Sequence, residues 1–166
     1  FCNYWVIGRP LRLFNLDTVI KKIDKIKDHA ENIGLISASL PPVDYVDKIV
    51  SAFPDKKFHL SSLRVDLISD DYLKLISKLG LKSFTIAPET GDDEDRYKLG
   101  KKFDNKLMTE FIIKSMDLGI NRFKLYFIIG LFENEEDKIV SLVEYIRKTI
   151  KERGIKINPR FSLSFN

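Results

Sequence analysis

The feature that most constrains the fold of this 166-residue chain is a regular alternation of two hydrophobic patterns. In some stretches apolar residues recur every three or four positions, as on the buried face of a helix, and in others they gather in a short run, as in a buried strand. The first helix is predicted from Leu16 to Ile33, and the first strand over residues 34–40, before Pro41 and Pro42. Strands separated by helices predict an α/β fold with parallel pairing through right-handed crossovers.

The same unit recurs along the rest of the chain. Further strands are predicted over residues 58–63, 81–87, 122–129 and 156–165. Ser69 is expected to cap a helix that ends at Gly80, and Gly119 is expected to end the helix that begins near Asn105. Asn134 and Asp137 are predicted to form a capping pair for the last long helix. Five parallel strands fit either a barrel or an open doubly wound sheet, and strand content does not choose between them.

Composition indicates one compact domain over residues 1–166, because 44% of the residues are hydrophobic. The net charge of +4 is spread along helix faces, so nucleic-acid binding is not implied by charge. No apolar run approaches the roughly 20 residues of a membrane span. One cysteine provides no disulfide framework, which fits a cytoplasmic protein.

The two ends of the chain suggest a piece of a longer protein. The first residues are Phe1 and Cys2, without a methionine, and residues 160–166 still have a strand pattern. We therefore expect the chain to be excised from a longer sequence. Taken alone, Cys2 would most often be a small buried apolar residue.

Polar residues follow the predicted strands where ligands bind in parallel α/β folds. Ser61, Ser62 and Arg64 come after residues 58–60 at the end of the second strand, Glu89 follows the third, and Gly130 follows the fourth. A carboxylate, hydroxyls and an arginine suit a zwitterionic ligand with a sugar, because arginine pairs with carboxylates and carboxylates accept from ribose hydroxyls. Neither glycine-rich phosphate loop motif, GxGxxG or GxxxxGKS, is present.

Each of these positions also has a purely structural explanation. Ser61, Ser62 and Arg64 can close a strand end, and Glu89 and Arg96 can form an ordinary surface ion pair. Residues 92–95, which are all acidic, read as a solvent-facing loop.

Four segments taken together resemble the radical S-adenosylmethionine enzymes. They are Phe1–Cys2 and residues 61–66 (SSLRVD), 85–101 (TIAPETGDDEDRYKLGK) and 123–137 (FKLYFIIGLFENEED). The similarity is closest to members that often carry an upstream cobalamin-binding domain, and it covers nearly the whole chain. It implies a partial, TIM-like (β/α)6 barrel whose first strand lies upstream. This chain would then run from the cluster loop to about the sixth strand.

The resemblance implies a role for individual residues. In that superfamily a C-x3-C-x2-C loop holds a 4Fe–4S cluster, and Cys2 matches its third cysteine. The residues implied to contact S-adenosylmethionine are Phe1 at the adenine, Ser37 and Ala38 at the methionine amino group, Glu89 and Arg96 at ribose or amino-acid groups, Lys101 as a further basic position, and Ile129 and Gly130 at the adenine. Ser61, Ser62 and Arg64 are candidate substrate contacts. Phe132 stands where the family generally has proline.

The implied activity is reductive cleavage of S-adenosylmethionine to a 5′-deoxyadenosyl radical that modifies a substrate. The implied cofactors are the 4Fe–4S cluster and S-adenosylmethionine, with cobalamin in a domain outside this chain, and the implied partner is a reductant such as ferredoxin or flavodoxin. With one of three cluster cysteines, the chain alone is expected to be inactive. The substrate is not predicted, since one fold supports many reactions.

Two other functions fit the same pattern. One is a barrel aldolase or isomerase, for which Lys124 is the best placed lysine; a Schiff-base lysine would have to point into the barrel. The other is a non-catalytic α/β interaction domain in which Cys2 is incidental.

Overall fold

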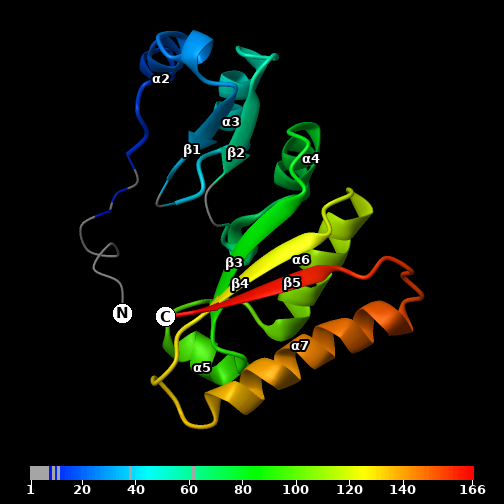
Figure 1. Ribbon diagram of the computed structural model, residues 1–166. Coiled ribbons are helices and arrows are strands. Elements are labelled where there is room, and N and C mark those ends of the chain that lie inside the picture. Colours follow the sequence, from blue (N-terminus) through cyan, green and yellow to red (C-terminus); the bar gives the residue numbers. More distant parts are fainter. Residues whose placement is uncertain (1–7, 9, 11, 38, 61–62) are drawn as a thin grey trace. The chain divides into compact units, whose positions relative to one another are not determined.

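The computed structural model of the protein describes residues 8, 10, 12–37, 39–60 and 63–166. Helices and strands alternate along the chain, and the paired strands are parallel (Figure 1). The strands are β1 (Asn32–Leu35), β2 (Lys57–Leu60), β3 (Ser83–Glu89), β4 (Arg122–Phe127) and β5 (Arg160–Phe165). The helices are α2 (Leu16–Asp24), α3 (Val43–Ser51), α4 (Asp70–Lys78), α5 (Asp93–Lys98), α6 (Asn105–Asp117) and α7 (Glu135–Glu152), with short 3-10 helices η1 (Lys27–His29) and η2 (Val65–Leu67). The predicted α/β fold class is confirmed.

Contacts within the chain divide it into two compact units. The first comprises the described part of residues 1–61 together with 69–80, and the second comprises the described part of residues 62–68 together with 81–166. The single domain expected over residues 1–166 stays a prediction. None of the described helices is long and apolar enough to cross a membrane.

The first unit is built around the parallel pair β1–β2. Ile33 and Phe58 are register partners, and both lie in a core with Ile23, Ile49 and Phe53. The predicted helix from Leu16 to Ile33 is wrong in its second half, because α2 ends at Asp24 and β1 begins at Asn32. Ile26 continues the helical spacing but is 49% exposed, so the apolar face no longer meets the core there.

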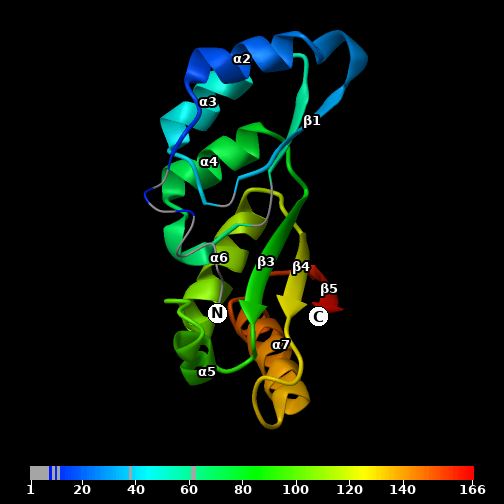
Figure 2. The same ribbon diagram turned by 90° about the vertical axis from the view of Figure 1, so that its left-hand side faces the viewer.

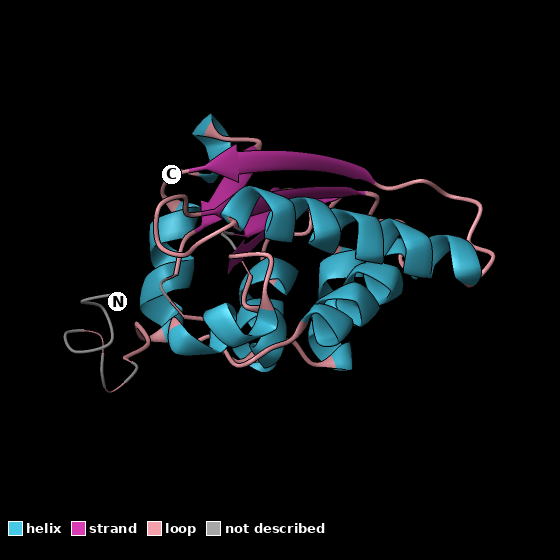
Figure 3. Ribbon diagram, turned by 90° about the horizontal axis from the view of Figure 1, so that it is seen from below, coloured by secondary structure: helices cyan, strands magenta, loops and turns pink. Residues whose placement is uncertain are grey.

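The second unit is a three-stranded parallel sheet in the order β3–β4–β5. One face packs against α6 and α7, as the view along the sheet shows (Figure 3). Phe84, Phe123 and Phe161 stand in one row across the strands, and the ring centroids of Phe84 and Phe111 from α6 lie 5.4 Å apart. The carboxyl ends of β3 and β4 point toward α5 and the start of α7 (Figure 2). Parallel folds bind ligands at that edge.

Most of the predicted helix-capping residues lie at the observed helix ends. Ser69 caps α4, since its side chain accepts from the Tyr72 N–H at 3.2 Å. Gly80 and Gly119 follow their helices with φ of +65° and +84°, as predicted. The capping pair of Asn134 and Asp137 is wrong, because Asn134 has φ of +55° and its side chain makes no capping hydrogen bond.

The prediction for the acidic stretch 92–95 is also wrong. The stretch was expected to be a solvent-facing loop, but Asp92 caps α5 by accepting from the Asp95 N–H at 3.0 Å. Asp95 itself is 5% exposed. A short helix with no apolar stripe leaves little trace in hydrophobic periodicity.

Candidate functional site

The carboxyl end of β3 presents a carboxylate in an unusual backbone conformation. Glu89, the last residue of the strand, has φ of +67°, a region that residues other than glycine seldom occupy. The pairing of β3 with β4 shifts register just before it. The Glu89 carbonyl accepts from the Ile128 N–H at 2.9 Å, which places Glu89 beside the turn that follows β4.

Lys101 fixes the side chain of Glu89. The distance from Lys101 Nζ to Glu89 Oε1 is 2.7 Å, and the two side chains are 19% and 13% exposed. Lys101 Nζ also donates to the Ala87 carbonyl. The pair is partly shielded from solvent, and one oxygen of the carboxylate, Oε1, is engaged at the strand end.

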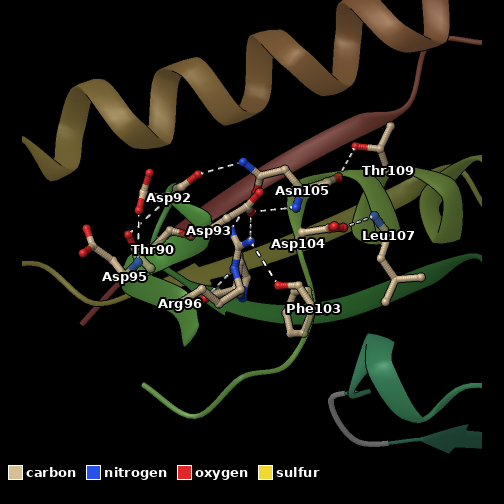
Figure 4. Close-up of polar contacts among 12 residues, drawn as sticks. Thr90, Asp92, Asp93, Asp95, Arg96, Phe103, Asp104, Asn105, Leu107 and Thr109 are labelled. Atoms are coloured by element: carbon tan, nitrogen blue, oxygen red, sulfur yellow. Dashed lines mark hydrogen bonds and ion pairs between the residues drawn. The ribbon is translucent and has the colours of Figure 1, made fainter. Parts of the chain in front are cut away.

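Arg96 is fully buried, and Figure 4 shows its side chain among Thr90, Asp93, Phe103 and Asn105. Its Nε donates to the Pro88 carbonyl at 3.3 Å, and its Nη2 donates to the Thr90 carbonyl at 2.8 Å. These two carbonyls flank Glu89. The other donors reach Asp93 Oδ1 at 2.7 Å, the Phe103 carbonyl at 3.4 Å and Asn105 Oδ1 at 2.8 Å. The guanidinium therefore shapes the turn directly.

All five N–H donors that an arginine possesses are used by these contacts. Burial lowers the pKa of Arg96, and the Asp93 carboxylate opposes that shift. The Phe103 ring centroid lies 5.1 Å from Arg96 Cζ. The predicted contact between Arg96 and S-adenosylmethionine stays a prediction, and it would require one of these bonds to be exchanged.

The same turn packs closely against α7. A Cβ on Gly91 would lie 2.1 Å from the Lys138 carbonyl oxygen, so only glycine fits there. Asp95 joins the two elements through Lys138 at 2.6 Å and also pairs with Lys98 at 2.9 Å. Hydrogen bonds from Lys138 and Lys98 lower the pKa of Asp95.

The turn after β4 is held by a carboxylate. Glu135, which is 3% exposed, accepts backbone N–H groups from Gly130 at 2.5 Å, Leu131 at 3.1 Å and Phe132 at 2.8 Å. Successive amides that converge in this way form an anion-binding concavity, and here the chain's own carboxylate fills it. Ile129 is 41% exposed and Leu131 is 44% exposed, so the turn presents apolar side chains on a fixed backbone.

The remaining predicted site residues that the structure describes have local partners. Ser37 is exposed, and its Oγ donates to the Ser39 carbonyl at 2.5 Å. Arg64 pairs with Asp66, with 2.5 Å between Nη2 and Oδ2. Phe1, Cys2, Ala38, Ser61 and Ser62 lie outside the described residues. The structure thus brings together Glu89, Lys101 and the turn that contains Ile129 and Gly130.

Sequence reasoning missed Glu135 and the structural role of Arg96. An acidic residue in the first turn of a helix was the only available signal for Glu135. Within the described residues, no group of three or more histidine, cysteine, aspartate or glutamate side chains is placed to hold a metal ion. Cys2 is the only cysteine, so the described part of the chain does not itself supply ligands for an iron–sulfur cluster.

Comparison with known proteins supports the fold. No protein-family model matches the chain. Over 166 aligned residues the chain is 28% identical to the uncharacterized protein MJ0966 of Methanocaldococcus jannaschii, an alignment that covers 96% of this chain and 37% of that relative. Among solved structures, the coproporphyrinogen III oxidase HemN from Escherichia coli, a radical SAM enzyme, matches with a TM-score of 0.64 at 11% identity over 91% of this chain. The chain shares the fold of a radical SAM enzyme.

A second solved structure gives the same result. HydG, a maturase of the [FeFe]-hydrogenase, matches with a TM-score of 0.56 at 15% identity over 93% of this chain. The chain spans 37% of HemN and 36% of HydG, little more than a third of either protein. At such low identity the similarity concerns the fold, and function has to be inferred from the site.

Proposed function

We propose that this chain is part of the core of a radical S-adenosylmethionine enzyme and binds S-adenosylmethionine at the carboxyl ends of β3 and β4. The observation that carries the proposal is the Glu89 carboxylate, held by Lys101 at 2.7 Å beside the Ile129–Gly130 turn. The fold shared with HemN supports this placement, because parallel α/β folds bind ligands at that edge.

The two turns offer complementary contacts to such a ligand. The carboxylate oxygens of Glu89 would accept hydrogen bonds from the ribose hydroxyls. The amides of Gly130, Leu131 and Phe132 are already bound by Glu135, so adenine would meet apolar surface at this turn, chiefly Ile129. Ser37 and Ala38 would contact the methionine amino group, as the sequence resemblance implies.

The cluster part of the proposal rests on the sequence resemblance. Cys2 would be one of three cysteine ligands of a 4Fe–4S cluster, with Phe1 near the adenine, and a cluster of this kind supplies the electron for reductive cleavage of S-adenosylmethionine. A reductant such as ferredoxin or flavodoxin, a cobalamin domain elsewhere in the protein, and a cytoplasmic location complete the proposal.

The first experiment tests the cluster. The full-length protein would be produced anaerobically, reconstituted with iron and sulfide, and compared with its Cys2→Ala variant by iron content and by the EPR spectrum of the reduced cluster with and without S-adenosylmethionine. We expect a cluster signal that S-adenosylmethionine changes and that Cys2→Ala abolishes. Absence of a cluster, or a cluster insensitive to Cys2→Ala, would contradict the proposal.

The second experiment tests the ligand site. Glu89→Gln is compared with Glu94→Gln, which removes an exposed carboxylate from α5 a few residues away. Because hydrogen bonds to charged groups contribute about 1.5–3 kcal/mol, Glu89→Gln should weaken S-adenosylmethionine binding on the order of tenfold or more. Glu94→Gln should leave the dissociation constant unchanged. Equal affinities for both variants would remove Glu89 from the site.

One observation favours a second candidate function. Lys124 alternates with the buried Phe123 and Leu125, so it projects from the sheet face opposite the helices, as a Schiff-base lysine in a barrel must. Trapping with borohydride in the presence of simple aldehydes and ketones, compared between the parent and Lys124→Met, tests this aldolase or isomerase activity. A non-catalytic interaction domain is the outcome if neither a cluster nor an adduct forms.

A further inference from the structure

The sheet of the second unit has two chemically different faces. The face against α6 and α7 carries buried apolar side chains such as Phe84, Leu125 and Phe127. The opposite face follows from the alternation of side chains and from the strand register. It comprises Ser83 and Thr85 from β3, Arg122, Lys124 and Tyr126 from β4, and Arg160, Ser162 and Ser164 from β5. We refer to these residues as the cationic face.

Three positive charges lie close together on the cationic face. Arg122 and Arg160 are direct register partners on adjacent strands, which sit about 4.8 Å apart in a sheet. Lys124 is two residues farther along β4, and its Nζ lies 4.7 Å from the centre of the Tyr126 ring. Like charges directly opposite each other destabilise strand pairing. The arrangement therefore has a cost that the fold itself does not require.

Nothing in the described part of the chain neutralises these charges. The cationic face contains no acidic residue. Arg122, Lys124 and Arg160 make no ion pair with any acidic side chain in residues 12–37, 39–60 or 63–166. This contrasts with Arg96 and Lys101 in the same unit, whose charges are both paired.

Five residues of the cationic face border a hollow in the surface, together with Phe123 and Phe161. Its volume is about 240 Å³, and its walls are Ser83, Arg122, Phe123, Lys124, Arg160, Phe161 and Ser162. Sites for small molecules usually measure about 300–1,000 Å³, so this hollow is large enough for only part of such a ligand. Nucleic acid needs a longer basic stripe than three side chains provide.

Parallel sheets are usually covered on both faces. An apolar layer is a poor cover for the cationic face, because burial of unpaired charge is strongly unfavourable. We propose that the cationic face binds an anionic small molecule with at least two carboxylate or phosphate groups. One group lies between Arg122 and Arg160, where the guanidinium N–H groups donate to its oxygens in bidentate geometry, and the other lies near Lys124. The serine hydroxyls at 83 and 162 add donors.

The anion site itself does not depend on the proposed function. Ser83, Arg122 and Arg160 are the first residues of β3, β4 and β5, so this site lies toward the amino ends of the strands, whereas S-adenosylmethionine is proposed to bind at the carboxyl ends.

Binding of two defined probes tests the proposal. Citrate and inorganic pyrophosphate are titrated separately into the full-length protein at a fixed ionic strength of about 0.15 M, and heat or amide chemical shifts are followed. We expect a dissociation constant of about 1 mM or lower for at least one of them. Tighter binding of citrate would identify a carboxylate ligand, and tighter binding of pyrophosphate would identify a phosphate ligand.

A matched pair of variants locates the bound anion. Arg160→Gln and Arg147→Gln each remove one exposed arginine, but Arg147 lies on α7. Loss of a charge-assisted hydrogen bond should make binding about tenfold weaker in Arg160→Gln, and Lys124→Gln should behave similarly. Arg147→Gln should change affinity less than about twofold, since a distant exposed charge is screened. Thermal unfolding verifies that each variant folds.

Three results would overturn the proposal. They are absence of binding of both probes, equal weakening by Arg160→Gln and Arg147→Gln, and binding of only a long polyanion such as heparin. The titration needs neither a cluster nor S-adenosylmethionine, so its outcome is separate from that of the Cys2→Ala experiment. Anion binding without a cluster would support this site and contradict only the proposed function.

Discussion

Two neighbouring turns in the second unit are each held by one buried charge, but the charges have opposite signs. After β3, the guanidinium of Arg96 gathers three backbone carbonyls and two side-chain oxygens. After β4, the carboxylate of Glu135 gathers three backbone amides. The first turn consequently presents the charged side chain of Glu89, whereas the second presents the apolar side chains of Ile129 and Leu131.

The difference shows how a chain can divide the work of one site between two strand ends. A ligand with a polar sugar and a flat apolar ring needs both kinds of surface. Each turn uses its own buried charge to satisfy backbone groups that would otherwise compete for the ligand. Arg96 and Glu135, whose buried charges hold the two turns, are therefore not the residues whose side chains face the ligand.

Removal of Arg96 should have the largest effect. Arg96→Met keeps an extended apolar side chain but leaves three carbonyls and the Asp93 carboxylate without their donor. Breaking a buried ionic network costs about 3–5 kcal/mol of unfolding free energy. Urea denaturation measures the loss, with Arg147→Met on the exposed face of α7 as control. A loss below about 1 kcal/mol would show that the network is not needed.

Arg96→Lys refines the same prediction. Lysine keeps the charge but has three donors without the planar fork, so it cannot reach both carbonyls that flank Glu89. We expect it to recover only part of the stability. If Arg96 acts through Glu89, the losses of S-adenosylmethionine affinity in Arg96→Lys and Glu89→Gln will not add in the double variant. Additive losses would indicate that Arg96 contacts the ligand independently.

Gly91→Ala should cause the next largest loss of stability. The added Cβ would lie 2.1 Å from the Lys138 carbonyl oxygen and 2.6 Å from the Ile139 nitrogen, both backbone atoms of α7. Overpacking of this kind costs about 1–3 kcal/mol, and the rigid neighbours place this site toward the upper end. Gly34→Ala is the matched control, because a Cβ there meets no atom within 4 Å. Equal thermal stability of the two variants would mean that the turn does not rest on α7.

Glu135→Gln should have an intermediate effect confined to the other turn. The amide oxygen retains one acceptor and loses the charge, so the amides of Gly130, Leu131 and Phe132 are incompletely satisfied, at about 1–3 kcal/mol. Hydrogen exchange of these three amides should accelerate, while exchange near Arg96 should not. Glu136→Gln, an exposed neighbour on α7, is the control. Unchanged exchange in Glu135→Gln would show that the carboxylate does not hold the turn.

The contrast between the turns also shows what the sequence can reveal. Alternating periods predicted the parallel α/β fold, and Ser69, Gly80 and Gly119 marked helix ends, because capping depends on residues within one turn of the chain. Glu89 was found because a carboxylate directly follows an apolar strand. Each of these features depends on residues that are close together in the chain, so a single sequence is enough to predict it.

The unpredicted features depend on backbone groups that only the folded turns bring together. Arg96 reads as a surface residue in an acidic stretch until Pro88, Thr90 and Phe103 place their carbonyls around it. Glu135 reads as an ordinary first-turn acid, and the helix expected through Ile33 ended early because tertiary packing placed that residue in a strand. Intrinsic helix propensity predicts the structure of a segment poorly where tertiary contacts determine that structure.

Removal of the ion pairs made by Asp95 should have the smallest effect. It should be visible only in how the unfolding free energy depends on pH. Asp95 pairs with Lys138 of α7 and with Lys98, and these contacts lower its pKa below the ordinary value of 3.8. A lowered folded-state pKa contributes stability that is present above the unfolded-state pKa and is lost as pH falls through the folded-state value. The unfolding free energies of the parent and Asp95→Asn should therefore differ by a constant amount above about pH 5, and the difference should shrink as the pH falls through the lowered pKa of Asp95. Asp71→Asn, at an exposed aspartate of α4, provides the comparison. A difference that grows toward low pH would have the wrong sign and would show that the Asp95 carboxylate does not stabilise the junction between α5 and α7.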